Sequence, residues 1–139
     1  ANCDQLVDLK INDWIIECIN KKADGSILIF NDNNPKWSFV SINSDGLIDD
    51  VKEKKVISNN ATVGIYFYRK GSYFVNSALS IIADSEKTND EYYVAPTYNY
   101  MIEKKMKIFP YKIPIQKMHG VGTPEDLKTF LSLDKKYDN

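Results

Sequence analysis

Two carboxylates near the start of the chain, Asp4 and Asp8, are of the type that binds hard cations. Asp4 follows what we interpret as the tail of a strand. In α/β sheets, ligands and metal ions bind at the carboxyl ends of strands. A carboxylate at such a place also commonly caps a turn or a helix. The pattern alone is therefore consistent with two roles for Asp4, a metal ligand and a capping residue.

A second pair of candidates, Glu53 and Lys54, comes shortly before the most β-like run of the sequence, residues 61–68. A lysine can neutralise a phosphate, and a glutamate can accept hydrogen bonds from sugar hydroxyls. Composition alone, however, favours a solvated charged loop at this place. Gly64 lies in the middle of the β-like run, which indicates that another backbone or a ligand approaches closely.

A glycine-rich turn, HGVGT at residues 119–123, precedes a predicted helix. Such a turn can offer backbone N–H groups to an anion, although a plain loop is the commoner outcome. His119 is the only histidine of the chain. Zinc sites with two or more histidines are therefore excluded, and a Ser-His-Asp arrangement would depend on this one residue.

Helices and strands alternate along the chain, which predicts an α/β fold. The apolar run at residues 26–30 is typical of a strand buried on both faces, as in a parallel or mixed sheet. Residues 43–46 (NSDG) predict a hairpin loop between two strands. We expect strands over residues 26–30, 37–42, 47–51, 61–68 and 107–113, and helices over 11–22, about 72–83, 96–104 and 124–131.

The predicted helices carry specific expectations about caps and faces. Asn12 or Asp13 is expected to cap the first helix, and Thr123 the last, with Pro124 in its first turn. The buried face of the first helix is predicted to contain Trp14, Ile15, Cys18 and Ile19. The second helix is predicted to direct inward Phe74, Val75, Ala78, Leu79 and Ile82.

Composition limits the class of protein. A chain of 139 residues with 43% hydrophobic and 27% charged residues is typical of one globular domain. Its 18 basic and 19 acidic residues give a net charge of -1, which argues against nucleic-acid or anionic-membrane partners. No run approaches the roughly 18 apolar residues of a membrane span, and no signal peptide is recognisable. We expect a soluble cytoplasmic protein with Cys3 and Cys18 as reduced, buried thiols.

Seven strings of residues, in their order and spacing, resemble the sugar-phosphate nucleotidyltransferases of the GT-A type, also called NDP-sugar pyrophosphorylases. The likeness is nearest to the branch that serves capsule and surface polysaccharides, and it covers residues 2–131. The strings are NCDQ (2–5), DGSIL (24–28), NPKWSF (34–39), EKK (53–55), ATVGIYF (61–67), DEYYVAP with YN (90–99) and GVGTPEDL (120–127).

The resemblance implies a Rossmann-like, three-layer α/β/α domain with a mixed sheet, and it implies roles for five residues. Asp4 matches the aspartate that holds the catalytic Mg²⁺ beside the nucleotide phosphates. Lys54 matches the lysine that contacts the phosphate of the sugar phosphate, and Glu53 the neighbouring acceptor for sugar hydroxyls. Gly64 matches the glycine whose backbone lies against the sugar, and Glu91 a sugar-contacting acid. Trp37 is interpreted as a core-packing residue and not as a platform for the ligand.

The implied reaction joins a sugar 1-phosphate, or a similar phosphorylated metabolite, to a nucleoside triphosphate. The phosphate of the sugar attacks the α-phosphorus, and pyrophosphate leaves. Because two anions approach each other, positive charge from Mg²⁺ and lysine is the main requirement. No protein nucleophile is needed, in agreement with the lack of a Cys-His or Ser-His constellation.

The sequence departs from the family pattern in three ways. The nucleotide-binding half with its glycine-rich phosphate loop is absent, Gly120 stands where many relatives have a second metal-binding aspartate, and Val56 replaces a proline. We therefore expect residues 1–139 to form a single partial domain that is inactive alone. Apolar surface at residues 27–30 should then need cover from the missing half or from a homo-oligomer.

Two other functions stay open. A GT-A glycosyltransferase uses the same fold and metal aspartate to cleave a nucleotide sugar, but Glu53-Lys54 and Gly64 favour the nucleotidyltransferase. A non-catalytic module that binds a sugar phosphate or serves assembly is supported by Gly120 and by the partial domain.

Overall fold

The computed structural model describes residues 1–134, with side chains up to residue 132. Its strands are β1 (Gln5–Val7), β2 (Gly25–Asn31), β3 (Phe39–Ile42), β4 (Ile48–Lys52), β5 (Asn60–Tyr68), β6 (Ile108–Lys112) and β7 (Met118–Gly120). Its helices are α1 (Ile11–Asn20), α2 (Gly71–Ala83), α3 (Thr97–Glu103), the 3-10 turn η1 (Ile115–Lys117) and α4 (Pro124–Asp134). Each predicted helix, and each of the five strands predicted with bounds, is confirmed to within a few residues at its ends. The expectation that Asp4 follows the tail of a strand is wrong, because Asp4 lies directly before β1.

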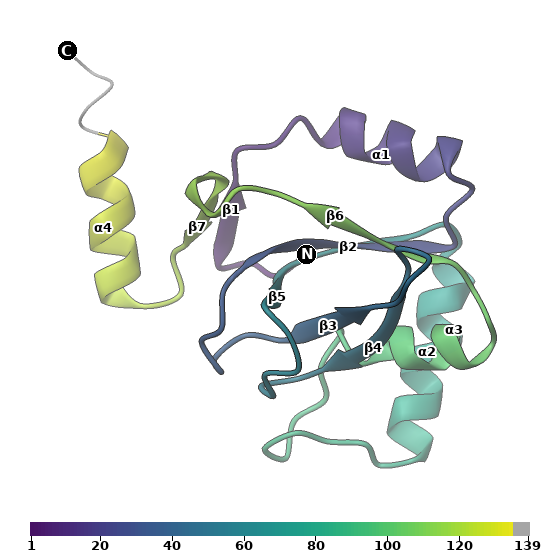
Figure 1. Cartoon of the computed structure of the whole chain (residues 1–139). Helices are drawn as coiled ribbons and strands as arrows, with labels where there is room; N and C mark the ends of the chain where they lie inside the picture. Colours follow the sequence, from purple (N-terminus) through teal and green to yellow (C-terminus); the bar gives the residue numbers. More distant parts are fainter. Residues whose placement is uncertain (135–139) are drawn as a thin grey trace.

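The main sheet has the strand order β4-β3-β5-β2-β6. It is mixed, because β2 pairs with β6 in parallel and with β5 antiparallel. Helix α1 covers one face of this sheet, and α2 and α3 lie on the other (Figure 1). The three-layer α/β/α class predicted from the sequence is thereby confirmed. A second sheet of β1 and β7 lies to one side, next to α4.

Strand β2 is the centre of the hydrophobic core. Its residues 27–30 are at most 1% exposed. Leu28 and Phe30 belong to the cluster on the α1 side, whereas Ile27 and Ile29 pack with the residues of α3. The expectation that residues 27–30 need an outside partner is therefore wrong. The neighbouring strands β5 and β6 pair with both edges of β2, and the helices cover both faces.

The predicted caps have different outcomes. Thr123 is confirmed as the cap of α4, because its Oγ1 accepts a hydrogen bond from the Asp126 N–H at 3.1 Å. The predicted cap of α1 is wrong, because that helix begins at Ile11 after Lys10 and has no side-chain cap. The hairpin between β3 and β4 is confirmed, with Gly46 at a φ of 76° and Asn43 Oδ1 accepting two backbone N–H bonds.

The predicted faces of the two long helices are only partly right. Helix α1 buries Trp14 and Cys18 as expected, but Ile19 is 54% exposed. Helix α2 buries Ser77 and Ile81 instead of the predicted set. The large members of that set are exposed: Phe74 36%, Val75 52%, Leu79 59% and Ile82 53%. Periodicity identified a stripe of apolar residues but not the side on which the core lies.

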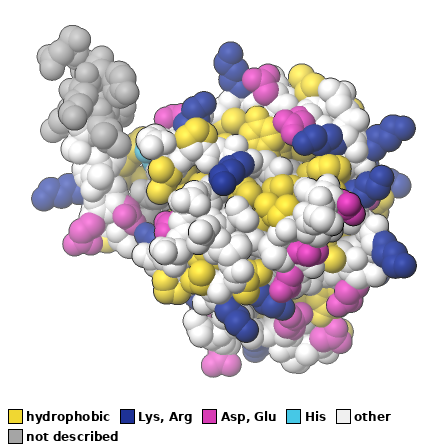
Figure 2. Space-filling view, in the orientation of Figure 1, with side chains coloured by type: hydrophobic (Ala, Val, Ile, Leu, Met, Phe, Trp, Pro, Cys, Tyr) yellow, Lys and Arg dark blue, Asp and Glu magenta, His cyan; other side chains and the backbone are white. Residues whose placement is uncertain are grey.

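Surface properties follow the composition. Basic and acidic side chains are interspersed over the face seen in Figure 2, without a field of one sign. Within residues 1–134, no helix has the length and apolar character needed to cross a membrane. Both thiols are free, but only Cys18 is buried. The expectation of two buried thiols is therefore wrong for Cys3, which lies in the exposed N-terminal segment.

Candidate functional site

A cavity of about 300 Å³ opens beside β5, between the N-terminal segment and the loops that flank β3 and β4. This volume lies at the lower end of the range for small-molecule sites. Its floor consists of Thr62, Gly64 and Tyr66, all on β5. Two walls rise from this floor, one built around the β1–β7 pair and the other around Lys54.

The first wall, which we call the β1–β7 wall, consists of Asp4, Gln5, Gly122 and Asp126. The antiparallel pairing of β1 with β7 and the bond from Val121 N–H to the Asp4 carbonyl (2.8 Å) hold it together. A Cβ placed on Gly122 would lie 2.8 Å from Asp4 Oδ2. The Asp4 carboxylate therefore lies directly over Gly122, and a side chain at that position would displace it.

Gly64 explains how the floor meets this wall. Its φ is 86°, a conformation that favours glycine. Its carbonyl accepts the Asn2 N–H at 2.8 Å, and an added Cβ would lie 2.2 Å from Gln5 Oε1. The close approach predicted from a glycine inside a strand is thus made by the N-terminal segment of the same chain. Gly64 also borders the cavity.

The second wall, which we call the lysine wall, consists of Trp37, Ser38, Glu53, Lys54 and Tyr93. Its polar groups pair with one another: Ser38 Oγ donates to Glu53 Oε2, and Lys54 Nζ donates to Tyr93 Oη at 2.5 Å. Lys54 Nζ also lies 4.7 Å from the centroid of the Tyr93 ring. The Trp37 ring meets Phe30 edge-on, as the predicted core packing requires, and it also lines the cavity.

The backbone of Lys54 is unusual. Its φ is 52°, in the left-handed region that costs energy for a residue with a Cβ. Such conformations cluster at binding and catalytic sites, where the surrounding structure holds them in place. Here Lys54 N–H donates to the Trp37 carbonyl at 3.1 Å, which ties the strained residue to the neighbouring loop.

The charges of the lysine wall are tuned by their neighbours. The hydrogen bond to Tyr93 and the nearby Glu53 and Glu91 raise the pKa of Lys54, so the ammonium stays charged at neutral pH. Burial raises the pKa of Glu53, against the opposing effects of the Ser38 hydroxyl and the Lys54 charge. The wall therefore presents a persistent cation beside a carboxylate that is costly to ionise.

The cavity brings together four of the five residues predicted for the site. Asp4, Glu53, Lys54 and Gly64 all line it. Glu91 does not; its carboxylate accepts a hydrogen bond from Tyr93 Oη, and it borders a separate cavity of about 210 Å³. Glu91 thus reaches the main cavity only through Tyr93.

Several lining residues were not predicted as site residues, among them Gln5, Tyr93 and Asp126. Tyr93 follows Glu91 closely in the string DEYYVAP, and Asp126 lies in the string GTPEDL, so the motifs already contained both. Gln5 belongs to the string NCDQ, but that string gave it no role, because its place in the cavity depends on the pairing of β1 with β7.

The glycine-rich turn is more ordered than the plain loop expected of it. Met118–Gly120 forms β7, and His119 pairs with Leu6 of β1. His119 Nε2 lies 2.9 Å from Asp8 Oδ2. Both side chains are therefore engaged with each other, away from the cavity lining.

The side chains of the β1–β7 wall carry oxygen atoms of the type that binds Mg²⁺. Gln5 Oε1 is buried without a hydrogen-bond partner, and Asp4 lines the same wall. A Cβ added to Gly120 would lie 3.9 Å from Asp126 Oδ2. The Asp126 carboxylate therefore lies near the space that a side chain at position 120 would occupy. Within residues 1–134 no three acidic, histidine or cysteine side chains gather at one point. Mg²⁺ is ordinarily held by one or two carboxylates together with substrate phosphates. The carboxylates of this wall are those of Asp4 and Asp126.

No family model and no curated protein matches the sequence. Solved structures do match the fold. A nucleoside-diphosphate-sugar pyrophosphorylase from Vibrio cholerae RC9 superposes with a TM-score of 0.76 at 24% identity, over 82% of this chain and 48% of that one. A protein described as a glucose-1-phosphate thymidylyltransferase from Bacillus anthracis, solved with sucrose, gives 0.69 at 18%, over 98% of this chain and 53% of that one.

These similarities establish the fold of the chain. Both matched proteins are roughly twice as long, so the chain spans about half the length of each. What the longer proteins catalyse and bind belongs to them, and it reaches this chain only as support for a proposal.

Proposed function

We propose that this chain is the sugar-phosphate-binding portion of a Mg²⁺-dependent nucleotidyltransferase. The observation that carries the proposal is the cavity in which Lys54 and Glu53 on one wall face Asp4 on the other. A cation, a hydrogen-bond acceptor and a carboxylate are the groups that a sugar phosphate and its metal ion require. The names of the two matched structures point to the same class of reaction.

Each wall has a separate task in this proposal. Lys54 binds the phosphate of the sugar phosphate, and its link to Tyr93 holds the ammonium at the cavity. Glu53 accepts hydrogen bonds from sugar hydroxyls with the oxygen that Ser38 leaves free. Because Gly64 has no side chain, the sugar can lie against the backbone of β5. Glu91 acts by orienting Tyr93.

The reaction is a phosphoryl substitution. An oxygen of the sugar phosphate forms a bond to the α-phosphorus of the nucleoside triphosphate, and the bond from that phosphorus to the β-phosphate oxygen breaks. Pyrophosphate leaves with the electron pair. Asp4 would hold the Mg²⁺ ion, which when bound would supply positive charge to the phosphates. The chain itself orients the sugar phosphate and offsets its charge through Lys54, without a covalent intermediate.

The proposal also covers the context of the chain. Residues 1–139 are a partial nucleotidyltransferase domain that turns over only together with a nucleotide-binding half. The product is a nucleotide sugar made in the cytoplasm, with capsule or surface polysaccharide as its destination. The two substrates, a nucleoside triphosphate and a sugar phosphate, are its small-molecule partners.

The first test is binding to the chain itself. Trp37 lines the cavity, so its fluorescence should change saturably when glucose 1-phosphate is added. Glucose, which lacks the phosphate, should bind at least about tenfold more weakly, because a charged hydrogen bond is lost. Equal binding of the two compounds would contradict the proposal.

The second test is turnover, measured on the protein in which this chain is joined to a nucleotide-binding half. Pyrophosphate release from a panel of nucleoside triphosphates with glucose 1-phosphate would support the nucleotidyltransferase. Sugar release from a nucleotide sugar would instead identify a glycosyltransferase. Binding of glucose 1-phosphate with neither reaction would identify a non-catalytic module.

A further inference from the structure

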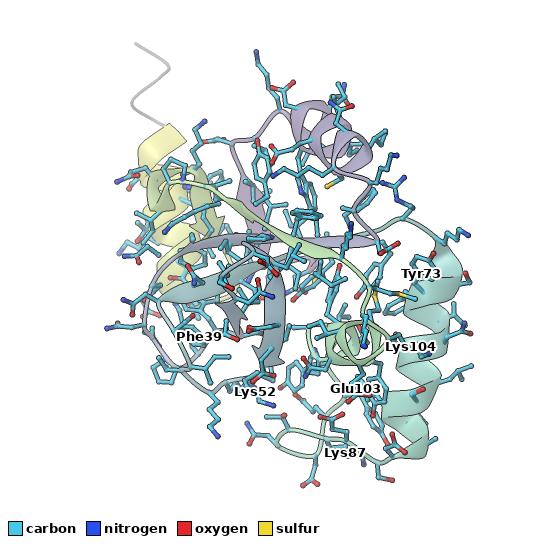
Figure 3. All side chains as sticks on the ribbon, turned by 45° about the vertical axis from the view of Figure 1, so that its right-hand side comes forward. Phe39, Lys52, Tyr73, Lys87, Glu103 and Lys104 are labelled. Atoms are coloured by element: carbon cyan, nitrogen blue, oxygen red, sulfur yellow. The ribbon has the colours of Figure 1, made fainter. Side chains whose placement is uncertain are left out.

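Ser38 and Glu53 lie opposite each other at the open end of the β3–β4 hairpin. The two strands pair antiparallel, with Phe39 opposite Lys52, and Figure 3 labels this pair. Ser38 and Glu53 are the next residues outward on the two strands. Because opposite residues of an antiparallel pair point to the same face, the register brings these two side chains together. Ser38 Oγ donates a hydrogen bond to Glu53 Oε2.

The backbone of Ser38 is held on both sides. One step further out, Lys54 N–H donates to the Trp37 carbonyl at 3.1 Å, so the two segments stay joined beyond Ser38. The Ser38 carbonyl accepts the N–H of Thr62, on the floor of the main cavity, at 2.8 Å. Ser38 lines the same cavity and is only 8% exposed. The sheet therefore fixes the hydroxyl, whose single proton is given to Glu53.

Glu53 lies between two cavities. It lines the main cavity of about 300 Å³ and also the separate cavity of about 210 Å³. The charged side chains that line the separate cavity with it are Lys52, Lys55, Glu86 and Glu91. The titratable side chains near it at the main cavity are Lys54, Tyr66 and Tyr93. Because basic residues lie on both sides of Glu53, its direction depends on the fixed donor, Ser38.

The Ser38 hydroxyl also affects the charge of Glu53. Burial raises the pKa of this carboxyl. Two groups oppose that effect, and the hydrogen bond from Ser38 opposes it more than the charge of Lys54 does. Without the hydroxyl, Glu53 would therefore take up its proton at a higher pH. A protonated carboxyl is a weaker acceptor than a carboxylate, because charged hydrogen bonds are the stronger ones.

We propose that Ser38 is a positioning residue of the site, whose hydroxyl fixes the Glu53 carboxylate at the main cavity as an ionised acceptor for the sugar. This role rests on the proposed function, in which Glu53 receives hydrogen bonds from sugar hydroxyls. Ser38 itself needs no contact with the ligand. Its effect passes through Glu53, so it depends on pH, whereas a residue that only supports the fold would act equally at every pH.

The first measurement needs no ligand. NMR titration of the Glu53 carboxyl in the whole chain reports its pKa, and Ser38→Ala should raise that pKa further, because a donor to the ionised form is lost. Ser41→Ala is the matched control. Ser41, on the same strand, donates the same kind of bond to Asp49, outside the lining of both cavities. This control should leave the pKa of Glu53 unchanged.

The second measurement is the affinity for glucose 1-phosphate as a function of pH. Wild type and variant are compared at each pH, so the titration of the ligand's own phosphate, at about pH 6, affects both equally. The loss in Ser38→Ala should be greatest between the two measured pKa values, where it approaches about tenfold. At pH 8 it should fall to about threefold or less, because Glu53 is then ionised in both proteins.

A double variant tests whether the effect passes through Glu53. Once Glu53→Gln has removed the carboxylate, adding Ser38→Ala should weaken binding no further, because coupled residues are not additive. Should Ser38→Ala change the circular dichroism of the chain, Ser38→Cys is judged by the same criteria, since it places a weaker donor of similar size there.

The outcomes separate this role from the proposed function. An unchanged pKa of Glu53 in Ser38→Ala overturns the role of Ser38. So does a loss of affinity that is equal at every pH, or a further loss in the double variant. In each of these cases normal binding by the wild type leaves the proposed function standing. A wild-type chain that does not bind glucose 1-phosphate contradicts the proposed function and the role of Ser38 together.

Discussion

On the lysine wall the polar side-chain groups form hydrogen bonds with one another, whereas on the β1–β7 wall the side-chain oxygen atoms have few hydrogen-bond partners. Ser38 holds Glu53, and Tyr93 holds Lys54. Across the cavity, Gln5 Oε1 is buried with no hydrogen bond, and the Asp4 carboxylate accepts none within the described part of the chain. Both walls nevertheless adjoin regular secondary structure. The floor between them is strand β5, and the β1–β7 wall is built on the paired strands β1 and β7.

This difference indicates how each wall meets its ligand. A wall whose groups are held by one another is preorganised, so it binds an anion without first ordering its side chains. A buried oxygen without a donor costs about 1–3 kcal/mol, and a water molecule, a ligand or a cation can remove that cost. In the function that we propose, the lysine wall is therefore formed before the substrate binds, and the β1–β7 wall is completed by its ion.

Removing the carboxylate of the unpartnered wall should have the largest effect. Asp4→Ala is expected to reduce pyrophosphate release about a hundredfold, in the protein that joins this chain to a nucleotide-binding half. The dependence on Mg²⁺ concentration should shift with it. Asp8→Ala is the matched control, because Asp8 pairs with His119 outside the cavity. Equal losses in both variants would mean that Asp4 acts through the stability of the β1–β7 sheet.

Removing the cation of the partnered wall comes next. Lys54→Ala should also reduce turnover about a hundredfold, and it should weaken glucose 1-phosphate binding to the chain at least about tenfold. Lys55→Ala makes the same change of charge one residue away, outside the lining of the cavity, and should leave the affinity nearly unchanged. Similar losses in the two variants would show that net charge, and not the place of Lys54, attracts the ligand.

The elements of the fold were predictable because their signals are local. The apolar run of β2, the NSDG hairpin and the proline after Thr123 each predict their structure from a few neighbouring residues. The orientation of α2 was not predictable in this way. Which of its two stripes meets the core depends on the position of α3 and β5, which are distant in sequence.

The residues of the candidate site show the same difference between local signals and contacts that are distant in sequence. Glu53, Lys54 and Gly64, which line the cavity, were pointed to by the resemblance of their strings to a known family, whereas composition alone favoured a solvated loop around Glu53 and Lys54. Gln5 enters the cavity only because β1 pairs with a strand more than a hundred residues away. Glu91 was predicted to contact the sugar, yet the turn at its place directs it to Tyr93, a contact that sequence spacing does not define.

The protonation of Glu53 offers a milder test of the partnered wall. Burial raises its pKa above the ordinary value of 4.5, so the folded chain holds this proton more tightly than the unfolded chain. Its contribution therefore favours folding below pH 4.5 and is lost as the pH rises through the raised pKa. Glu53→Gln should remove that loss, leaving the chain as stable as the wild type at pH 7 or up to about 1 kcal/mol more stable.

The same variant should bind glucose 1-phosphate about tenfold more weakly, because a carboxylate acceptor is lost. Urea unfolding from below pH 4.5 to pH 7 and a binding titration measure the two effects on one sample. Glu103→Gln, which changes an exposed carboxylate of α3 outside the cavity, is the control. A variant that is less stable at pH 7 but binds normally would place Glu53 in the structure and not in recognition.

The smallest effect should come from Tyr93→Phe, which removes one hydroxyl and keeps the ring near Lys54. The hydrogen bond to Tyr93 is the main cause that raises the pKa of Lys54, so its loss should lower that pKa. Binding of glucose 1-phosphate should weaken about two- to fivefold, and its decline at alkaline pH should begin at a lower pH.

Tyr92→Phe is the matched control for this change, because the neighbouring Tyr92 is 44% exposed and lies outside the cavity lining. It should alter neither the affinity nor its pH profile. An unchanged alkaline profile in Tyr93→Phe would show that Lys54 is positioned by its strained backbone alone. A loss as large as that of Lys54→Ala would show that the tyrosine hydroxyl itself contacts the ligand. In either case the pairing of side chains would no longer distinguish the lysine wall from the β1–β7 wall.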